Sequence, residues 1–390
     1  MSARTSPLRR FRRRINRRFY RALVCFYRAA FPARVPRGRI APGSLRRILL
    51  VRHDRVGDMI VTTPVLAFLR DVAPQAELDV LASPANAPLV AADERVARVF
   101  TNDHTWRGWL AVLPQLRARR YDAILSVIYG KGLREGLTAA LIARRHTHRV
   151  SVIRPKRYAG LFTLLVRVPR AERHMAQKLL FVVQQALDTG PVPKRAATDR
   201  YPLAVAIGAE ADERAARFVA EHGIDRFVAV NLASAEASKE WSPSVCAEVL
   251  RLLLPRYPAL AFVLTPPPGK LEPAERVARA LGSPRVLLYP PPSILVLSAI
   301  LQRSVVVLTP DTANVHVASA VRRPVLALYT PLTNPPGLWS PFQVPHRIVE
   351  AAAGQPVSTI GAETIARAFD DLMREIGAVE GAPDALARAP

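Results

Sequence analysis

Three charged side chains lie in the segments that follow predicted strands, at positions where a side chain can do chemistry. Asp58 is the first of them and follows Gly57 and the apolar run Ile48–Val51, at the start of a predicted helix. A carboxylate there can act as a general base on a hydroxyl group. The alternative is a helix cap, because Asp is a preferred N-cap residue and is favoured by the helix dipole. For Asp54, in the same segment, we expect a turn residue.

Lys239 and Asp311 follow two later predicted strands in the same way. Lys239 lies in the stretch NLASAEASKEWSP, and a loop lysine is either a compact donor to phosphate or a solvated surface residue. Asp311 and Thr312 begin a predicted helix. The unpaired N–H groups of that helix can bind an anion or can simply be capped by these side chains. For Trp241, beside Lys239, we expect packing rather than ligand stacking.

These side chains can act on a ligand only if the strands before them end at the edge of a sheet where the ligand binds. Apolar runs predict strands at 48–52, 78–81, 96–100, 123–127, 227–232, 260–265, 286–288, 305–308 and 325–329. Helical periodicity falls between them, at 60–72, 106–119, 133–144, 171–190, 244–254, 274–281, 294–302 and 313–320. The predicted fold class is therefore α/β, with two doubly wound parallel sheets that leave a cleft at the carboxyl ends of their strands. No G-x-G-x-x-G is present, which argues against a dinucleotide enzyme.

Composition supports two globular domains and concentrates charge at one end. The chain has 390 residues and a formal net charge of +25, and residues 1–47 hold fifteen Arg and no acid. The remaining 343 residues thus carry only +10. Cys25 and Cys246 are the only cysteines, which indicates neither a disulfide framework nor a zinc site and fits a reducing cytoplasm.

The arginine-rich N-terminus predicts an amphipathic helix. Its apolar residues recur at three- and four-residue steps: Leu8, Phe11, Ile15, Phe19, Leu23, Phe26 and Ala30. Such a helix can lie in an anionic membrane interface, but it is too charged to span a bilayer and lacks the features of a signal peptide. The alternatives are a helix docked on its own protein, a disordered arm and an arm that binds nucleic acid.

Taken together, the motifs resemble glycosyltransferase family 9, typified by the ADP-heptose:lipopolysaccharide heptosyltransferases. The likeness covers residues 47–342 and keeps the order and spacing of four stretches. They are R-x-D-x-x-G-D with T-T-P at Arg52–Pro64, the Lys239-x-Trp241 loop, D-T-A-x-x-H at Asp311–His316, and P-V-L-A-L-Y-T-P at Pro324–Pro331. The resemblance implies a GT-B architecture, with the acceptor on the first Rossmann-like domain and the nucleotide-sugar on the second.

The resemblance also implies roles for individual residues in an inverting, metal-independent sugar transfer that needs no cofactor. Asp58 matches the family's general base, and Lys239 matches the lysine that holds the donor diphosphate. Further donor contacts are implied at Ser238, Glu275, Asp311, Thr312, Ala313 and His316, and acceptor-side positions at Arg52, Asp54 and Arg55. Ala313 stands where the family usually has glycine, and we expect this methyl group to alter how the donor fits.

From these features we expect an N-terminal extension at 1–44, an acceptor domain at 45–200, a nucleotide-sugar domain at 201–378 and a disordered tail at 379–390. The expected partners are an ADP-heptose donor, a lipid-linked glycan acceptor and an anionic membrane surface contacted through residues 4–30, without nucleic acid or metal. This predicts a peripheral protein on the inner face of the bacterial cytoplasmic membrane. The competing hypothesis is a non-catalytic scaffold of the same fold that binds glycan or nucleotide.

Overall fold

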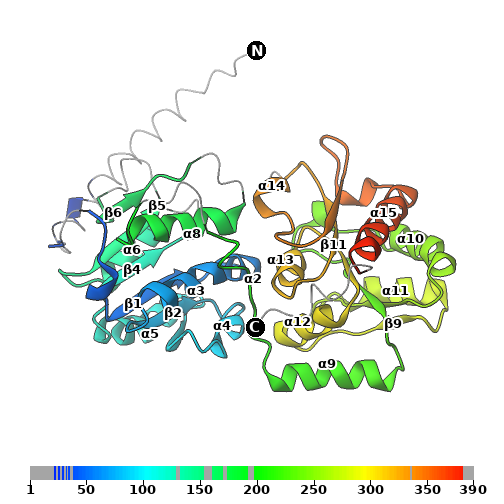
Figure 1. Cartoon of the computed structure of the whole chain (residues 1–390), viewed down its shortest axis with the longest axis horizontal. Helices are drawn as coiled ribbons and strands as arrows, with labels where there is room; N and C mark the ends of the chain where they lie inside the picture. The colour runs from blue at the N-terminus through cyan, green and yellow to red at the C-terminus, as the bar shows by residue number, and fades with distance from the viewer. Residues whose placement is uncertain are drawn as a thin grey trace, which may run out of the picture. The chain divides into compact units, whose positions relative to one another are not determined.

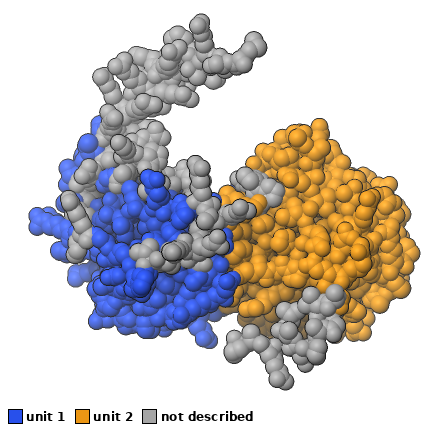
Figure 2. All heavy atoms as spheres, turned by 45° about the horizontal axis from the view of Figure 1, so that its top comes forward, with its two compact units in different colours: residues 1–55, 64–172, 176–201 blue, residues 56–63, 173–175, 202–390 orange. Residues whose placement is uncertain are grey.

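The computed structural model describes residues 38–128, 132–152, 160–169, 174–191, 197–333 and 336–380, and isolated positions between 22 and 35. These residues form two compact units, which Figure 2 shows in different colours. The described residues of unit 1 fall within Met1–Arg55, Pro64–Glu172 and Ala176–Tyr201. Those of unit 2 fall within Val56–Thr63, Arg173–Met175 and Pro202–Pro390. The segment that carries Asp58 therefore packs with the C-terminal half of the chain.

Unit 1 is built on a six-stranded sheet in which all neighbouring strands are parallel (Figure 1). Its order is β3-β2-β1-β4-β5-β6, so the chain reverses its direction of winding between β1 and β4. The strands are β1 (Arg47–Arg52), β2 (Glu77–Ala82), β3 (Arg98–Thr101), β4 (Ala123–Ser126), β5 (His148–Val152) and β6 (Leu164–Val166). The helices are α3 (Thr63–Val72), α4 (Pro88–Ala91), α5 (Trp106–Ala118), α6 (Gly132–Ile142) and α8 (Met175–Ala186).

Unit 2 repeats the same winding, with the order β12-β11-β10-β7-β8-β9 and parallel pairs throughout. Its strands are β7 (Phe227–Val230), β8 (Ala261–Leu264), β9 (Val286–Leu288), β10 (Val306–Pro310), β11 (Val325–Tyr329) and β12 (His346–Glu350). Its helices are α2 (Val56–Ile60), α9 (Ala209–Glu221), α10 (Pro243–Arg256), α11 (Leu271–Leu281), α12 (Ile294–Arg303), α13 (Ala313–Ala320), α14 (Pro336–Trp339) and α15 (Ala362–Glu380).

The central strands form because their apolar runs are buried on both faces of a sheet covered by helices. In β1, Leu49 and Leu50 are both fully buried although they point to opposite faces. In unit 1, Leu49 shares a core with Val112 and Leu116 of α5. In unit 2, the core under β7, β8 and β10 is closed by side chains from α10, α11 and α15. The predicted α/β fold with two doubly wound sheets is confirmed.

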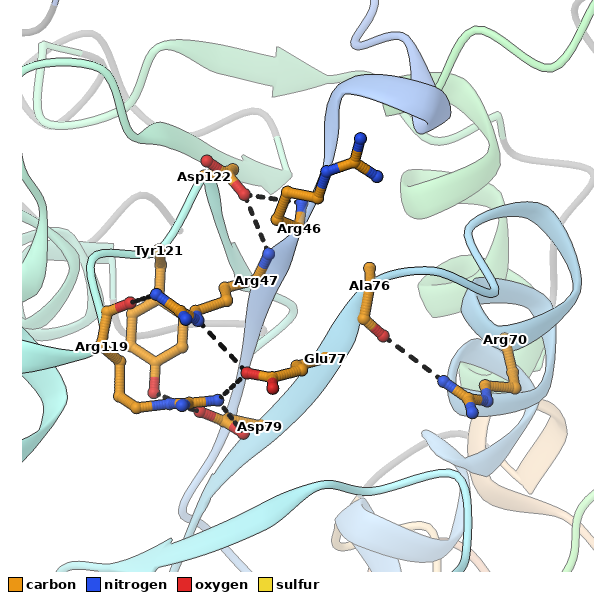
Figure 3. A network of polar contacts seen from close by, with 9 residues as sticks. All are labelled: Arg46, Arg47, Arg70, Ala76, Glu77, Asp79, Arg119, Tyr121 and Asp122. Atoms are coloured by element: carbon orange, nitrogen blue, oxygen red, sulfur yellow. Dashed lines mark hydrogen bonds and ion pairs between the residues drawn. The ribbon is translucent and has the colours of Figure 1, made fainter.

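A polar network closes the amino ends of the strands in unit 1 (Figure 3). Asp79 of β2 is fully buried and accepts hydrogen bonds from Arg119 Nε at 2.7 Å and from the Tyr121 hydroxyl at 2.8 Å. Arg119 also pairs with Glu77, which Arg47 contacts from β1 at 3.2 Å. Burial and the Asp79 charge raise the pKa of the Tyr121 hydroxyl, which keeps it a proton donor. The network ties β1, β2 and the end of α5 together, away from the opposite edge of the sheet where the motifs lie.

The single helix predicted at 60–72 is instead two helices, α2 and α3, separated near Thr62. Pro64 has no N–H to donate to the Ile60 carbonyl four residues earlier. The Thr63 hydroxyl takes that place and donates to the Ile60 carbonyl oxygen at 2.8 Å. The Thr62 hydroxyl donates in the same way to the Asp58 carbonyl oxygen at 2.7 Å. The break separates the helix that carries Asp58 from α3.

The other predicted strands and helices are present, with ends that differ by a few residues. Strands β5, β6 and β12 and helices α9 and α15 were not predicted, and α15 runs to Glu380, two residues into the predicted tail. Among the residues that the structure describes, no helix is both long enough and apolar enough to cross a membrane. The predicted amphipathic helix at 4–30 lies outside the described residues, apart from isolated positions.

Candidate active site

A buried ion pair joins the loops after β7 and β10. These strands are neighbours at the point where the winding of unit 2 reverses, which is where doubly wound sheets bind ligands. Lys239, at the end of the short 3-10 helix η2 (Ala237–Lys239), places its Nζ 2.7 Å from Asp311 Oδ2. Both side chains are more than nine-tenths buried. The alternative of a solvated loop lysine is therefore wrong.

The N-terminus of α13 lies directly beside this ion pair in the sequence. Thr312 is the N-cap residue, and its hydroxyl accepts a hydrogen bond from the Asn314 N–H at 3.3 Å. Asn231, at the end of β7, donates from Nδ2 to the Thr309 hydroxyl at 3.2 Å and to the Thr312 hydroxyl at 3.5 Å. A cationic lysine and the first turn of an eight-residue helix thus adjoin, and both favour an anion.

Ala313 is the first residue of α13, at the position where the resemblance implies glycine. Its backbone is not among those with positive φ, so the helix start does not require glycine. The residue is half-buried. An alanine is therefore accommodated without backbone strain, and its methyl group adds volume at the N-terminus of α13.

Lys270 was missed by the sequence reasoning and contacts both ends of the loop that carries Lys239. Its Nζ donates to the Ser234 carbonyl oxygen at 2.7 Å and pairs with the Glu240 carboxylate. The signal that could have found it is the scarcity of lysine, because the chain has only six. Asn231, also missed, is the polar residue directly after the four buried residues of β7.

Two further predicted donor residues lie nearby in the fold without joining the ion pair. Glu275 is half-buried in the second turn of α11, and Ser238 is half-buried within η2. Neither side chain forms a hydrogen bond or ion pair with another residue in the described part of the chain. Trp241 is 2 % exposed and belongs to the core beside α10, so the expectation of packing is confirmed.

The segment with Asp58 packs directly on the start of α13. A Cβ built on Gly57 would lie 3.7 Å from the Ala313 Cα and 2.8 Å from His316 Cδ2, so only glycine fits this approach without movement. Asp58 is half-buried and lies in the first turn of α2. Because α2 begins at Val56, Asp58 is not its N-cap residue. The structure thus brings the region of Asp58 against the helix that begins at Ala313.

His316 fixes this approach from the α13 side. Burial, with a smaller effect of His174, lowers the pKa of the His316 imidazole to about 3, so the ring is neutral at neutral pH. Its Nδ1 is buried and has no hydrogen-bond partner among the described residues. The ring is surrounded by Trp339 and His174, and His174 stacks on Phe342 with ring centroids 4.2 Å apart. The neutral His316 ring therefore packs against Gly57, and its donor contact stays a prediction.

The three predicted acceptor-side residues lie at the carboxyl end of β1 in unit 1, where Arg52 is the last residue of the strand and Asp54 and Arg55 follow it. Arg52 is 1 % exposed, donates to the Val127 carbonyl oxygen at 3.0 Å and pairs with Asp54 at 3.3 Å. Asn86 Nδ2 donates to the Asp54 carbonyl oxygen at 3.2 Å, which makes Asp54 a bound turn residue as expected. Arg55 is exposed. The Asp54 side chain is 21 % exposed, while Arg52 is buried and stabilises the turn.

Unit 2 therefore holds one arrangement with clear chemical capability. A buried lysine and the start of α13 can hold an anionic group such as a diphosphate without a metal ion. The carboxylate of Asp58 lies one residue from the glycine packed on that helix start. This combination suits a displacement in which negative charge develops on a phosphate leaving group while a hydroxyl loses its proton.

Known proteins match this chain in sequence and in fold. Residues 109–364 match the family described as glycosyltransferase family 9 (heptosyltransferase). Lipopolysaccharide heptosyltransferase 3 of Escherichia coli K12 is 22 % identical over 289 residues, which cover 70 % of this chain and 79 % of the relative.

Solved structures share the fold at low identity. A glycosyltransferase family 9 protein of Veillonella parvula superimposes with a TM-score of 0.71 at 20 % identity, covering 85 % of this chain and 97 % of the other. The ADP-heptose lipopolysaccharide heptosyltransferase II of E. coli superimposes with a TM-score of 0.68 at 18 % identity. The match covers 85 % of this chain and 99 % of the other. The E. coli heptosyltransferase WaaC, solved with ADP, superimposes with a TM-score of 0.63 at 20 % identity. The match covers 85 % of this chain and 98 % of the other.

Proposed function

The chain belongs to glycosyltransferase family 9, and from that premise we propose that it transfers a heptose from ADP-heptose to a lipopolysaccharide core or related envelope glycan. The enzyme is a glycosyltransferase with two Rossmann-like sheets in the GT-B fold. The names of its relatives support the sugar and the acceptor class, because they are lipopolysaccharide heptosyltransferases. A relative of the same fold was solved with ADP and with an ADP-heptose analogue, which supports the donor.

The observation that carries the proposal is the packing of Gly57 on Ala313, which sets the Asp58 segment beside the start of α13. In the proposed reaction, the acceptor hydroxyl gives its proton to the Asp58 carboxylate and its oxygen attacks the anomeric carbon. The bond from that carbon to the diphosphate oxygen breaks as the new bond forms, which inverts the anomeric configuration. One carboxylate is sufficient for this step, because no covalent sugar intermediate is needed.

The proposed role of Lys239 and the start of α13 is to stabilise the leaving diphosphate. Negative charge grows on the phosphate oxygens in the transition state, and a preorganised ammonium group near helix N–H groups lowers its energy. Asp311 holds the Lys239 ammonium group in place at 2.7 Å. Ser238 and Glu275 are proposed to contact the nucleotide, and Arg55 to contact the acceptor. The protein is further proposed to work at the inner face of the cytoplasmic membrane, held there through residues 4–30.

A sugar-transfer assay with ADP-heptose and heptose-deficient lipopolysaccharide tests the proposal. Asp58→Asn should lower kcat about 100-fold or more, the usual contribution of a general base, while Asp225→Asn in an exposed turn should not. The product of the wild type should carry the inverted anomeric configuration. Nucleotide binding without any transfer by the wild type to lipopolysaccharide acceptors would favour the non-catalytic scaffold instead.

A further inference from the structure

The outer face of α5 in unit 1 exposes large apolar side chains that the proposed chemistry does not use. In the described part of the chain, five large hydrophobic residues are exposed, and two of them lie one turn apart on this helix. Trp106 is 67 % exposed and Leu110 is 64 % exposed. Their spacing of four residues places both on one face of the helix. The opposite face of the helix is packed, because Val112 and Leu116 are buried in the core against the sheet.

The remaining exposed residues of α5 complete a surface without negative charge. They are Arg107, Ala111, Pro114, Gln115 and Ala118. The helix contains no Asp or Glu along its whole length. The Arg107 guanidinium lies 5.4 Å from the centre of the Trp106 ring, so a cation accompanies the exposed aromatic side chain. Arg98 of the neighbouring strand β3 and Arg120 after the helix are exposed as well.

The nearest acid in the sequence does not reverse this charge pattern. Asp103 precedes the helix, and its Oδ1 accepts hydrogen bonds from the Thr105 N–H at 2.9 Å and from the Thr105 hydroxyl at 2.7 Å. Thr105 in turn caps the helix by accepting from the Gly108 N–H at 3.0 Å. The Asp103 carboxylate therefore stabilises the turn that starts α5 and lies against Gly108, which is two residues from both Trp106 and Leu110 and so on the opposite side of the helix.

We propose that this face of α5, defined by Trp106, Arg107 and Leu110, docks on an anionic lipid bilayer. Tryptophan is suited to the boundary between headgroups and acyl chains, because its ring is apolar and its N–H is polar. Leucine one turn later would enter the acyl region, and Arg107 would remain at the level of the phosphates. A surface that is apolar, accompanied by arginine and free of acid matches the chemistry of such a bilayer.

The position of α5 would let membrane docking bring a lipid-linked acceptor close to unit 1. The helix begins after β3, at the same edge of the unit 1 sheet as the loop that follows β1. His53 of that loop lies with its ring 4.8 Å from His104 and 6.2 Å from Trp109 of α5. If the proposed function holds, a bilayer against α5 would present a lipid-linked acceptor beside the residues that follow β1. The docking itself does not depend on that function.

The first test measures partition of the full chain onto vesicles of phosphatidylglycerol and phosphatidylcholine. Trp106→Ser/Leu110→Ser should weaken partition at least tenfold, which corresponds to about 1.4 kcal/mol, because two large apolar side chains would no longer be buried in the bilayer. Leu271→Ser/Leu332→Ser is the matched control, because these side chains are exposed on unit 2. It should partition as the wild type does. Equal partition of both double variants would contradict the proposal unless the second measurement finds Trp106 in the bilayer.

That second measurement covers the case in which residues 4–30 dominate binding. Emission from Trp106 is obtained as the difference between wild type and Trp106→Phe on vesicles that carry bromine on their acyl chains. We expect the bromine to quench this emission by at least half. Unquenched emission together with unchanged partition overturns the proposal and leaves the α5 face to a protein partner. Neither measurement needs donor or acceptor, so a failure here is distinct from a failure of the proposed transfer.

Discussion

At the scale of single residues, the pair of Lys239 and Asp311 determines how a diphosphate would enter the candidate site. The Lys239 ammonium group is almost fully buried and is already neutralised by Asp311 at 2.7 Å. An anion that binds must share the three N–H donors of Lys239 with this carboxylate. The start of α13 supplies further N–H donors, so the site does not depend on lysine alone.

His316 gives a residue-scale prediction about pH. Its folded-state pKa of about 3 lies below the unfolded value near 6.5, so between these values the unfolded chain binds a proton that the folded chain does not. The free energy of unfolding therefore falls as the pH drops below 6.5, by about 1.4 kcal/mol per pH unit. Above pH 6.5 this contribution to stability is fully present.

Urea unfolding at pH 7 and pH 5 measures the effect. His316→Asn should lose about 2 kcal/mol less stability than the wild type over this interval, because it lacks the titrating ring. His146→Asn, at an exposed turn, should lose as much as the wild type. An identical pH slope for His316→Asn and the wild type would show that the buried ring does not titrate as argued.

At the scale of elements, the loop that carries Lys239 is held at both ends by Lys270. Lys270→Met removes the bonds to Ser234 and Glu240, so the loop should become less ordered and ADP should bind about fivefold to tenfold more weakly. In a working transfer assay, the donor KM should rise with little change in kcat. Isothermal titration with ADP and the transfer assay measure the two effects.

Two variants control for a general loss of stability. Lys270→Arg keeps a cation that can contact both partners and should recover most of the affinity, whereas Lys178→Met on α8 should leave ADP binding unchanged. Should Lys270→Met bind ADP as tightly as the wild type, Lys270 would have no part in positioning Lys239.

At the scale of the whole molecule, the central strands could be predicted because burial on both faces leaves continuous apolar runs, as in Ile48–Val51. Strand β5 was missed because the sequence His148–Val152 mixes polar and apolar residues, and β6 has only three residues. The motifs located Lys239 and Asp311, but not their ion pair. Such contacts between residues that are distant in sequence arise from the packing of loops, and the hydrophobic periodicity of the sequence does not predict them.

The packing of Val56–Thr63 with unit 2 could not be predicted for the same reason. The sequence places this segment between β1 and α3 of unit 1, whereas its contacts are with α13. The close fit of Gly57 on His316 is visible only when both helices are in place. Both units nevertheless follow one topology, so the ligand-binding edge of each sheet was predictable from strand order alone.

The central claim is that Lys239 holds the donor diphosphate while Asp58 acts on the acceptor, and calorimetric titration with ADP in the absence of divalent metal tests it most directly. The account predicts that the wild type and Asp58→Asn bind ADP equally, and that Lys239→Met binds it about tenfold or more weakly, since bonds to charged groups contribute about 1.5–3 kcal/mol. Equal binding by Lys239→Met and the wild type, or an absence of ADP binding by the wild type, would contradict it.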